Sequence, residues 1–249
     1  MVREKKKNPV SPPSTPLEMT LVGIAKKKVE VRRSSRARKA PLNFTDKYWQ
    51  FFGDLPSYRV NEHQNAGGRH SSAILGPGAG LGKGSDSVGD KPQAIQAIKK
   101  KYPGTTFISG HLLNADFGGD GKDHKNLTVL TSTGNANHKK FDEPIKKALM
   151  QLRTAYQAMN ELGIDVKAIR YGIKVDIEVT GKEWGDTYPN NCIFKSLTCK
   201  AKVVNDDKAL AELVPHKNRE KADAAITAVQ HLVDEANANG EIANLPDGE

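Results

Sequence analysis

The sequence predicts an α+β fold, because its strand-like and helix-like segments are grouped rather than strictly alternating. Residues 169–179 place an apolar side chain at every second position, with mostly charged residues between, which predicts a long half-buried strand. After a turn, residues 193–204 predict a second strand that pairs with the first as a long hairpin. Apolar residues at helical spacing over residues 141–162 and 222–233 predict two amphipathic helices.

The positive charge of the chain is concentrated near its N-terminus. Residues 1–40 contain 12 of the 38 Lys and Arg residues and 3 of the 29 Asp and Glu residues, which leaves 26 of each sign elsewhere. Charge runs mixed with Pro and Ser leave this segment little apolar surface to bury. We therefore expect a disordered basic tail over residues 1–42 and a folded domain over residues 43–249. The tail could hold nucleic acid by counterion release, engage a delivery machinery, or only improve solubility.

Export signals and disulfides are not expected. No apolar run approaches the roughly 18 residues that a membrane helix needs, and the charged N-terminus lacks the apolar centre of a secretory signal. Cys192 and Cys199 are seven positions apart, and an odd spacing of this kind would place them on opposite faces of one strand. We therefore expect synthesis and folding in a reducing cytoplasm, no membrane span, and no export by the Sec route.

A glycine-dense segment at residues 70–87 invites comparison with nucleotide-binding loops. A P-loop needs Gly, four residues, and then Gly-Lys-Ser/Thr. Here Pro77 occupies the first glycine position and Lys83 is followed by Gly84. The spacing of a dinucleotide-binding fingerprint is also absent. We interpret the segment as a flexible loop, and nucleotide binding by residues 76–85 is kept as a third, weaker hypothesis.

The segment 107–143 groups histidine and asparagine residues around a glycine-rich turn. β-Branched and aromatic residues over 105–109 predict a strand that ends at or just before His111, where a side chain can face solvent. Residues 118–121 predict a hairpin-type turn, and residues 127–130 predict the second strand. A single histidine at a strand end is most often a surface residue, so only the whole set of residues supports a site.

A helix follows this hairpin directly in the sequence. Thr131 or Ser132 can serve as its N-cap. Asn135 and His138 are three residues apart, so they share one face of the helix. Pro144 either kinks this helix or starts a new one. The segment therefore predicts the order strand, turn, strand, helix.

This order resembles the ββα-metal nuclease superfamily, which includes the HNH endonucleases and the DNA/RNA non-specific endonucleases. The likeness is strongest to nuclease domains of bacterial toxins and secreted effectors, and it covers residues 107–143 tightly and 60–240 loosely. The matching parts are Gly110-His111-Leu112-Leu113-Asn114, Gly118-Gly119, Asn126-Leu127, Asn135-Asn137-His138 and Glu143. The resemblance implies a ββα-metal core over about residues 105–162, to which the long hairpin and a C-terminal helix are added.

The resemblance also implies catalytic roles. His111 would be the general base that takes a proton from the attacking water, which suits the ordinary pKa of histidine near 6.5. Asn126 would tie the loop below the site, so that His111 points correctly. Asn114 would position the backbone of the substrate. The basic residues that would contact the nucleic acid are Lys125, Lys139 and Lys140.

A divalent cation is part of the same implied site. Asn135 would bind the ion, His138 would be a second ligand or a phosphate contact, and Glu143 would orient the hydrated ion. An amide oxygen with water as the remaining ligands suits Mg²⁺ or Mn²⁺ better than Zn²⁺. The chain departs from many HNH motifs at Gly110, where those motifs carry an Asp or a His that binds the metal.

From these observations we expect a metal-dependent endonuclease that cuts DNA or RNA without strong sequence specificity. The resemblance implies a toxin or effector that is made in the cytoplasm and delivered to another cell by a non-Sec route. Such a protein needs an immunity or inhibitor protein in the cell that makes it. The alternative is a non-catalytic nucleic-acid-binding protein that acts through its basic N-terminal tail.

Overall fold

The computed structural model describes residues 40–82, 84–87, 91–204 and 216–246. The chain divides into two compact units, Met1–Ala37 and Arg38–Glu249, and all the elements below belong to the second unit. The predicted tail lies almost entirely outside the described residues, so its disorder stays a prediction. Ala40 and Leu42 already bond to side chains of a long helix, Ala40 by its carbonyl oxygen and Leu42 by its amide.

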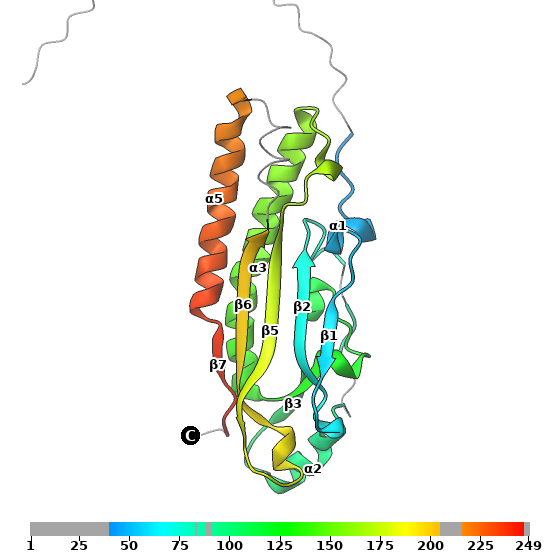
Figure 1. Cartoon of the computed structure of the whole chain (residues 1–249), viewed down its shortest axis with the longest axis vertical. Helices are drawn as coiled ribbons and strands as arrows, with labels where there is room; N and C mark the ends of the chain where they lie inside the picture. Colours follow the sequence, from blue (N-terminus) through cyan, green and yellow to red (C-terminus); the bar gives the residue numbers. More distant parts are fainter. Residues whose placement is uncertain (1–39, 83, 88–90, 205–215, 247–249) are drawn as a thin grey trace, which may run out of the picture. The chain divides into compact units, whose positions relative to one another are not determined.

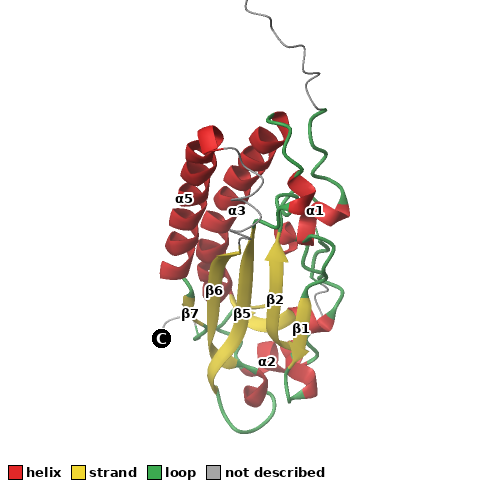
Figure 2. Ribbon diagram, turned by 45° about the horizontal axis from the view of Figure 1, so that its top comes forward, coloured by secondary structure: helices red, strands yellow, loops and turns green. Residues whose placement is uncertain are grey.

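The fold is α+β, as predicted, and its largest part is a five-stranded antiparallel sheet with the strand order β1-β2-β5-β6-β7 (Figures 1 and 2). The strands are β1 (Ser57–Val60), β2 (Gly68–Leu75), β5 (Gly172–Glu183), β6 (Phe194–Val204) and β7 (Glu241–Ala243). The predicted long hairpin is confirmed, since β5 pairs with β6 from Gly172 opposite Val204 to Glu183 opposite Phe194. The hairpin is not an addition to a core but the centre of this sheet.

Strand β2 corrects the interpretation of residues 70–87 as a flexible loop. It lies between β1 and β5 and pairs with both of them. Ser71, Ala73 and Leu75 are buried, and the residues between them are half-buried. The alternation was missed because it is carried by small and hydroxyl side chains, which give a weak apolar pattern. Glycines that follow the strand do form a loop, but it carries no nucleotide-binding spacing.

Four helices are described: α1 (Lys47–Phe51), α2 (Ala94–Lys101), α3 (Ser132–Glu161) and α5 (His216–Ala238). Thr131 is the N-cap of α3, and its hydroxyl accepts a hydrogen bond from the amide of Gly134 at 2.9 Å. Pro144 lies inside α3, so the alternative that a new helix starts there is wrong. None of the described helices is both long and apolar enough to cross a bilayer.

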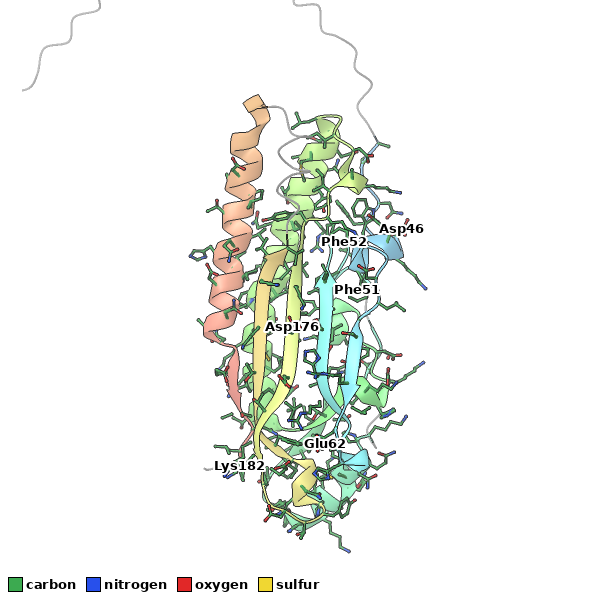
Figure 3. All side chains as sticks on the ribbon, viewed as in Figure 1. Asp46, Phe51, Phe52, Glu62, Asp176 and Lys182 are labelled. Atoms are coloured by element: carbon green, nitrogen blue, oxygen red, sulfur yellow. The ribbon has the colours of Figure 1, made fainter. Side chains whose placement is uncertain are left out.

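Helices α3 and α5 lie side by side against one face of the sheet (Figures 1 and 2). The residues that meet in this core include Ile173, Val175 and Ile177 of β5, Phe141, Ile145 and Leu152 of α3, and Val229 and Val233 of α5. Asp176 lies on the opposite, polar face of the sheet (Figure 3). Burial of each apolar side chain in this core stabilises the fold by about 1.5–3 kcal/mol relative to leaving that side chain in water.

The aromatic residues of α1 and its C-cap pack onto this core. The Trp49 ring meets the ring of Tyr156 edge to face at a centroid distance of 5.5 Å, and Phe52 lies 6.5 Å from the same tyrosine. These aromatic side chains therefore serve core packing. Cys192 and Cys199 are free thiols, as predicted, and both are buried. The reason given was wrong, because Cys192 precedes β6 instead of lying on the same strand as Cys199.

A separate two-stranded sheet precedes α3. Strand β3 (Phe107–His111) pairs antiparallel with β4 (Leu127–Thr131), and His111 stands opposite Leu127. The strand begins two residues later than predicted, because Thr105 belongs to the preceding turn. Because the strands are antiparallel, Phe107 at the start of β3 lies opposite Thr131, where β4 runs directly into α3, and the three elements form a continuous β-β-α unit.

Candidate active site

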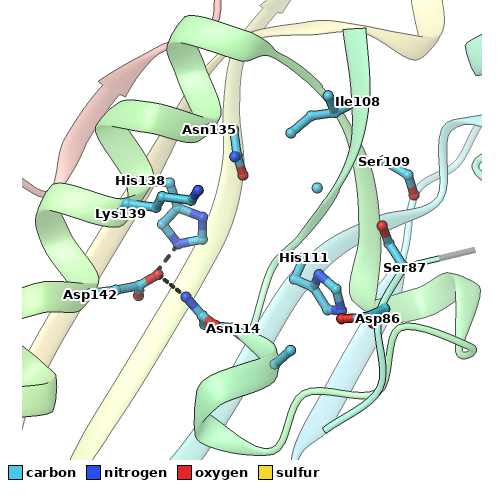
Figure 4. A pocket seen from close by; sticks show the side chains of 12 residues that line it. Asp86, Ser87, Ile108, Ser109, His111, Asn114, Asn135, His138, Lys139 and Asp142 are labelled. Atoms are coloured by element: carbon cyan, nitrogen blue, oxygen red, sulfur yellow. Dashed lines mark hydrogen bonds and ion pairs between the residues drawn. The ribbon is translucent and has the colours of Figure 1, made fainter. Parts of the chain in front are cut away.

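A cavity of about 250 Å³ opens between the end of β3 and the first turns of α3 (Figure 4). Three parts of the chain line it, and its ionisable and amide side chains are those of Asp86, His111, Asn114, Asn135, His138, Lys139 and Asp142. The β-β-α unit therefore brings together five of the nine residues proposed from the sequence. Asn126, Glu143, Lys125 and Lys140 lie outside the cavity.

His111 is the last residue of β3 and is half-buried. Its Nε2 lies 2.9 Å from the carbonyl oxygen of Ser85. A carbonyl oxygen can only accept, so Nε2 carries the hydrogen of this bond. In the neutral ring Nδ1 is then the nitrogen with a free lone pair, which is the state that a general base requires.

The segment around Ser85 is fixed onto the glycine-rich turn. The hydroxyl of Ser85 accepts a hydrogen bond from the amide of Gly121 at 2.8 Å and donates one to the carboxylate of Asp120. This second bond is the main reason that the pKa of Asp120 lies below its ordinary value. A Cβ on Gly84 would lie 1.9 Å from the carbonyl oxygen of Gly119, so only glycine permits this close approach. The glycine-dense segment thus holds the acceptor that orients His111.

Asn126 is fully buried and lies behind the cavity rather than in it. Its Oδ1 accepts a hydrogen bond from the amide of Leu113 at 2.8 Å, and its Nδ2 donates to the carbonyl oxygens of Leu113 and Asp120. These bonds connect the two ends of the turn. Asn126 can therefore set the backbone that carries His111 but cannot touch a substrate in the cavity.

Asn135 and His138 face the cavity from the first turns of α3, opposite His111 (Figure 4). The side chain of His138 is almost completely buried, and its ring stacks on Phe141 at a centroid distance of 6.4 Å. Its Nε2 has no hydrogen-bond partner among the described residues. The nearest carboxylate oxygen belongs to Asp142 and is 4.0 Å away, which is too far for a hydrogen bond.

Asp142 is the functional candidate that the sequence did not reveal. It is 2% exposed, and its Oδ2 accepts a hydrogen bond from Nδ2 of Asn114 at 2.6 Å. Burial raises the pKa of Asp142, while the nearby His138 acts in the opposite direction. Oδ1 of Asn114 accepts from the amide of Asp116 at 2.8 Å, so the orientation of the Asn114 amide is fixed by both of its ends.

The structure places Asp142, and not Glu143, on the cavity side of α3. Glu143 is exposed and pairs with Lys146 at 2.9 Å. The reason is helical geometry: a residue seven positions after Asn135 lies only about 20° from it around the helix axis, whereas the eighth lies about 80° away. The proposed role of Glu143 in orienting a metal ion is therefore not supported by its position.

The three lysines proposed to contact nucleic acid differ in their position relative to the cavity. Lys139 lines the cavity, so its ammonium group lies within reach of a phosphate held there. Lys125 and Lys140 are exposed and lie outside the cavity. They can contact a long substrate only beyond the reacting phosphate.

The cavity fits a hydrated divalent cation better than a closed metal site. Over the described part of the chain, no group of three or more His, Cys, Asp or Glu side chains is arranged to hold a metal ion. Asn135 lines the cavity from α3 and offers an amide oxygen, whereas Nε2 of His138 is buried and is directed toward Oδ1 of Asp142, 4.0 Å away (Figure 4). Mg²⁺ keeps several water ligands and needs few from protein, so this donor set suits it, whereas a structural Zn²⁺ site needs four.

Gly110 explains why β3 contributes no ligand. A Cβ at this position would lie 2.4 Å from Cδ1 of Leu130, so a side chain cannot be placed there without displacing the buried side chain of Leu130. A carboxylate on the His111 side of the cavity comes instead from Asp86, in the segment that follows β2 (Figure 4).

Comparisons of this chain with protein-family models, with curated proteins and with solved structures gave no match.

Proposed function

We propose that this protein is a metal-dependent endonuclease that hydrolyses phosphodiester bonds of DNA or RNA without strong sequence specificity. The observation that carries the proposal is the cavity in which His111, at the end of β3, faces Asn135 and His138 on α3. A general base on one side and cation ligands on the other are what the attack of water on a phosphodiester requires.

His111 would take the proton from the attacking water through Nδ1. The hydrogen bond from Nε2 to the carbonyl oxygen of Ser85 fixes the ring and its tautomer. It also stabilises the imidazolium that forms when the proton arrives, because a carbonyl dipole favours a positively charged donor. The ring is half-buried, so water can reach it from the cavity.

Asn135 and His138 would hold the cation, which when bound neutralises charge on the phosphate and stabilises the leaving oxygen. Asp142 and Asn114 form the wall beneath these residues, and their 2.6 Å hydrogen bond keeps that wall in place. Lys139 adds a positive charge at the rim. Because residues 41–249 contain equal numbers of basic and acidic residues, the site must hold phosphate through local charges of this kind.

The test is digestion of supercoiled plasmid and of RNA in the presence of Mg²⁺ or Mn²⁺. Wild type should cleave at least one of them, and His111→Ala should lose the activity. His231→Ala, an exposed histidine on α5, is the matched control and should cleave like wild type. The proposal fails if wild type cleaves neither substrate with any divalent ion, or if His111→Ala cleaves as fast as the control.

We further propose that the nuclease acts as a toxin or effector delivered to another cell, which rests on the resemblance of residues 107–143 to such domains. Expression in bacteria without an inhibitor protein should then stop growth, and His111→Ala should restore it. Normal growth with wild-type protein that cleaves plasmid in vitro would contradict the toxin role while leaving the enzymatic proposal in place.

The alternative function is nucleic-acid binding without catalysis, and it is favoured by the excess of 12 basic over 3 acidic residues in residues 1–40. Deleting this segment should then abolish binding to labelled DNA or RNA in a gel-shift measurement. His111→Ala should bind nucleic acid normally under either function. The two functions are separated by the chain that lacks residues 1–40, which should still cleave nucleic acid only if the protein is a nuclease.

A further inference from the structure

Asn244 follows β7 directly and is only 1% exposed, yet its side-chain amide is fully used. Its Oδ1 accepts a hydrogen bond from the amide of Thr131 at 2.7 Å. Its Nδ2 donates to the carbonyl oxygens of Phe194 at 2.8 Å and Val129 at 3.2 Å. A buried amide whose donors and acceptor all have partners is costly to disturb, because each bond that is lost leaves a buried polar atom unsatisfied.

These bonds join the two sheets at one point. Val129 and Thr131 belong to β4, and Phe194 is the first residue of β6. The backbone of Asn244 strengthens the joint, since its amide donates to the carbonyl oxygen of Lys195 at 2.7 Å and its carbonyl accepts from Nε1 of Trp184 at 3.0 Å. The β-β-α unit is thereby fixed to the larger sheet where β4 becomes α3.

The same joint sets the first turn of α3. The amide of Thr131 donates to Oδ1 of Asn244, and the hydroxyl of Thr131 caps the helix by accepting from the amide of Gly134. A Cβ on Gly134 would lie 2.9 Å from Oδ1 of Asn244, so the side chain of Asn244 is in close contact with the residue that precedes Asn135. The position of Asn135 therefore depends on Asn244.

We propose that Asn244 is a positioning residue for the cation side of the active site. It holds the start of α3, and with it Asn135 and His138, at a fixed place relative to His111 on β3. This inference rests on the proposed function, because it assigns to Asn244 an effect on cation use. A role in stability alone would leave the cation requirement of the folded protein unchanged.

Asn237 offers a matched control. Its Oδ1 accepts from the amide of Ala201 at 2.7 Å and its Nδ2 donates to the carbonyl oxygen of the same residue at 2.9 Å. It therefore joins α5 to β6 by the same kind of bonds, and both of these side-chain bonds go to Ala201 rather than to the β-β-α unit. Asn237→Ala and Asn244→Ala should both reduce stability, and only the second should disturb the site.

The experiment measures the Mn²⁺ concentration that gives half-maximal plasmid cleavage, at a temperature where each variant is folded. Asn244→Ala should raise this concentration about tenfold or more, as loss of a residue that orients metal ligands does, and Asn237→Ala should leave it unchanged. Gly134→Ala is a second variant that gains helix propensity but presses on the same joint, and it should raise the concentration too. Equal concentrations in wild type, Asn244→Ala and Gly134→Ala overturn the inference.

Amide hydrogen exchange separates failure of this inference from failure of the proposed function. Exchange at Gly134 and Asn135 should be faster in Asn244→Ala than in Asn237→Ala, whether or not the protein cleaves nucleic acid. Absence of cleavage by wild type overturns the proposed function and the effect on cation use, and exchange then decides whether Asn244 positions the helix. Unchanged exchange at both residues overturns the positioning role itself.

Discussion

The two halves of α3 bury very different side chains. The second half buries Leu149, Leu152 and Tyr156 against the large sheet, as an amphipathic helix does. The first half buries Phe141 and Ile145 in the same core, but it also buries His138 and Asp142, although such groups are rarely buried without strong partners. Burial of apolar groups lowers the free energy of the fold, whereas burial of these polar groups costs free energy. This difference supports the proposal that the first half of α3 serves a binding site as well as the core.

Replacing the proposed base should have the largest effect on activity. His111→Ala should lower the rate of cleavage about 100- to 10,000-fold, the usual range for loss of a general base. Its unfolding free energy should change little, because the ring is only half-buried and its one hydrogen bond goes to the backbone of Ser85. The rate is measured by plasmid cleavage and the stability by urea unfolding. A large loss of stability would show that His111 is structural instead.

The second half of α3 should give the opposite result. Leu152 is fully buried, so Leu152→Ala should lower the unfolding free energy by about 2–5 kcal/mol through lost burial and the cavity that remains. Its rate of cleavage, measured well below its unfolding temperature, should stay close to that of wild type. A loss of activity as large as that of His111→Ala would remove the distinction between the two halves.

Two neighbouring acidic residues test the boundary between the site and the surface. Asp142→Asn should reduce cleavage about 10- to 100-fold, because it removes the carboxylate charge beside the proposed cation ligands and weakens the acceptor that holds the Asn114 amide. Glu143→Gln changes an exposed residue that pairs only with Lys146 in the described structure, and it should cleave like wild type. Both rates come from the same plasmid measurement. The reverse order would restore the role first proposed for Glu143.

The smallest effect is expected at the turn that holds Ser85. The hydrogen bond from Ser85 lowers the folded-state pKa of Asp120 below its ordinary value of 3.8, so the folded protein releases this proton more readily than the unfolded chain. The stabilisation is therefore fully present above pH 3.8 and is lost as pH falls through the lowered pKa. Urea unfolding between pH 2 and 6 should show a weaker acid dependence in Asp120→Asn than in wild type. Identical curves would show that this bond does not contribute.

Apolar periodicity predicted the parts of the fold that it encodes. The β5–β6 hairpin, α3 with its Thr131 cap and the apolar face of α5 follow from spacing alone. Strand β2 was missed because Ser71 and Ala73 mark its buried face instead of large apolar residues. The three-residue strand β7 has too few residues to show a period.

The candidate site was predictable only where its residues are close in the sequence. Asn135 and His138 share a helical face, and His111 ends the neighbouring strand. Local sequence patterns therefore predicted all three residues. Ser85 and Asn244 act through backbone contacts that tertiary folding creates, and no sequence spacing marks such contacts. Asp142 could have been found from its separation of seven residues from Asn135, which is close to two helical turns.

The most direct test of the two-sided site is the rate of cleavage as a function of Mn²⁺ concentration for wild type, His111→Ala and Asn135→Ala. Asn137→Ala, two residues away on α3 and outside the cavity, is the control. The account predicts that His111→Ala lowers the maximal rate without changing the half-saturating Mn²⁺ concentration, whereas Asn135→Ala raises that concentration. A wild-type maximal rate for His111→Ala, a wild-type half-saturating Mn²⁺ concentration for Asn135→Ala, or no cleavage by wild type would contradict it.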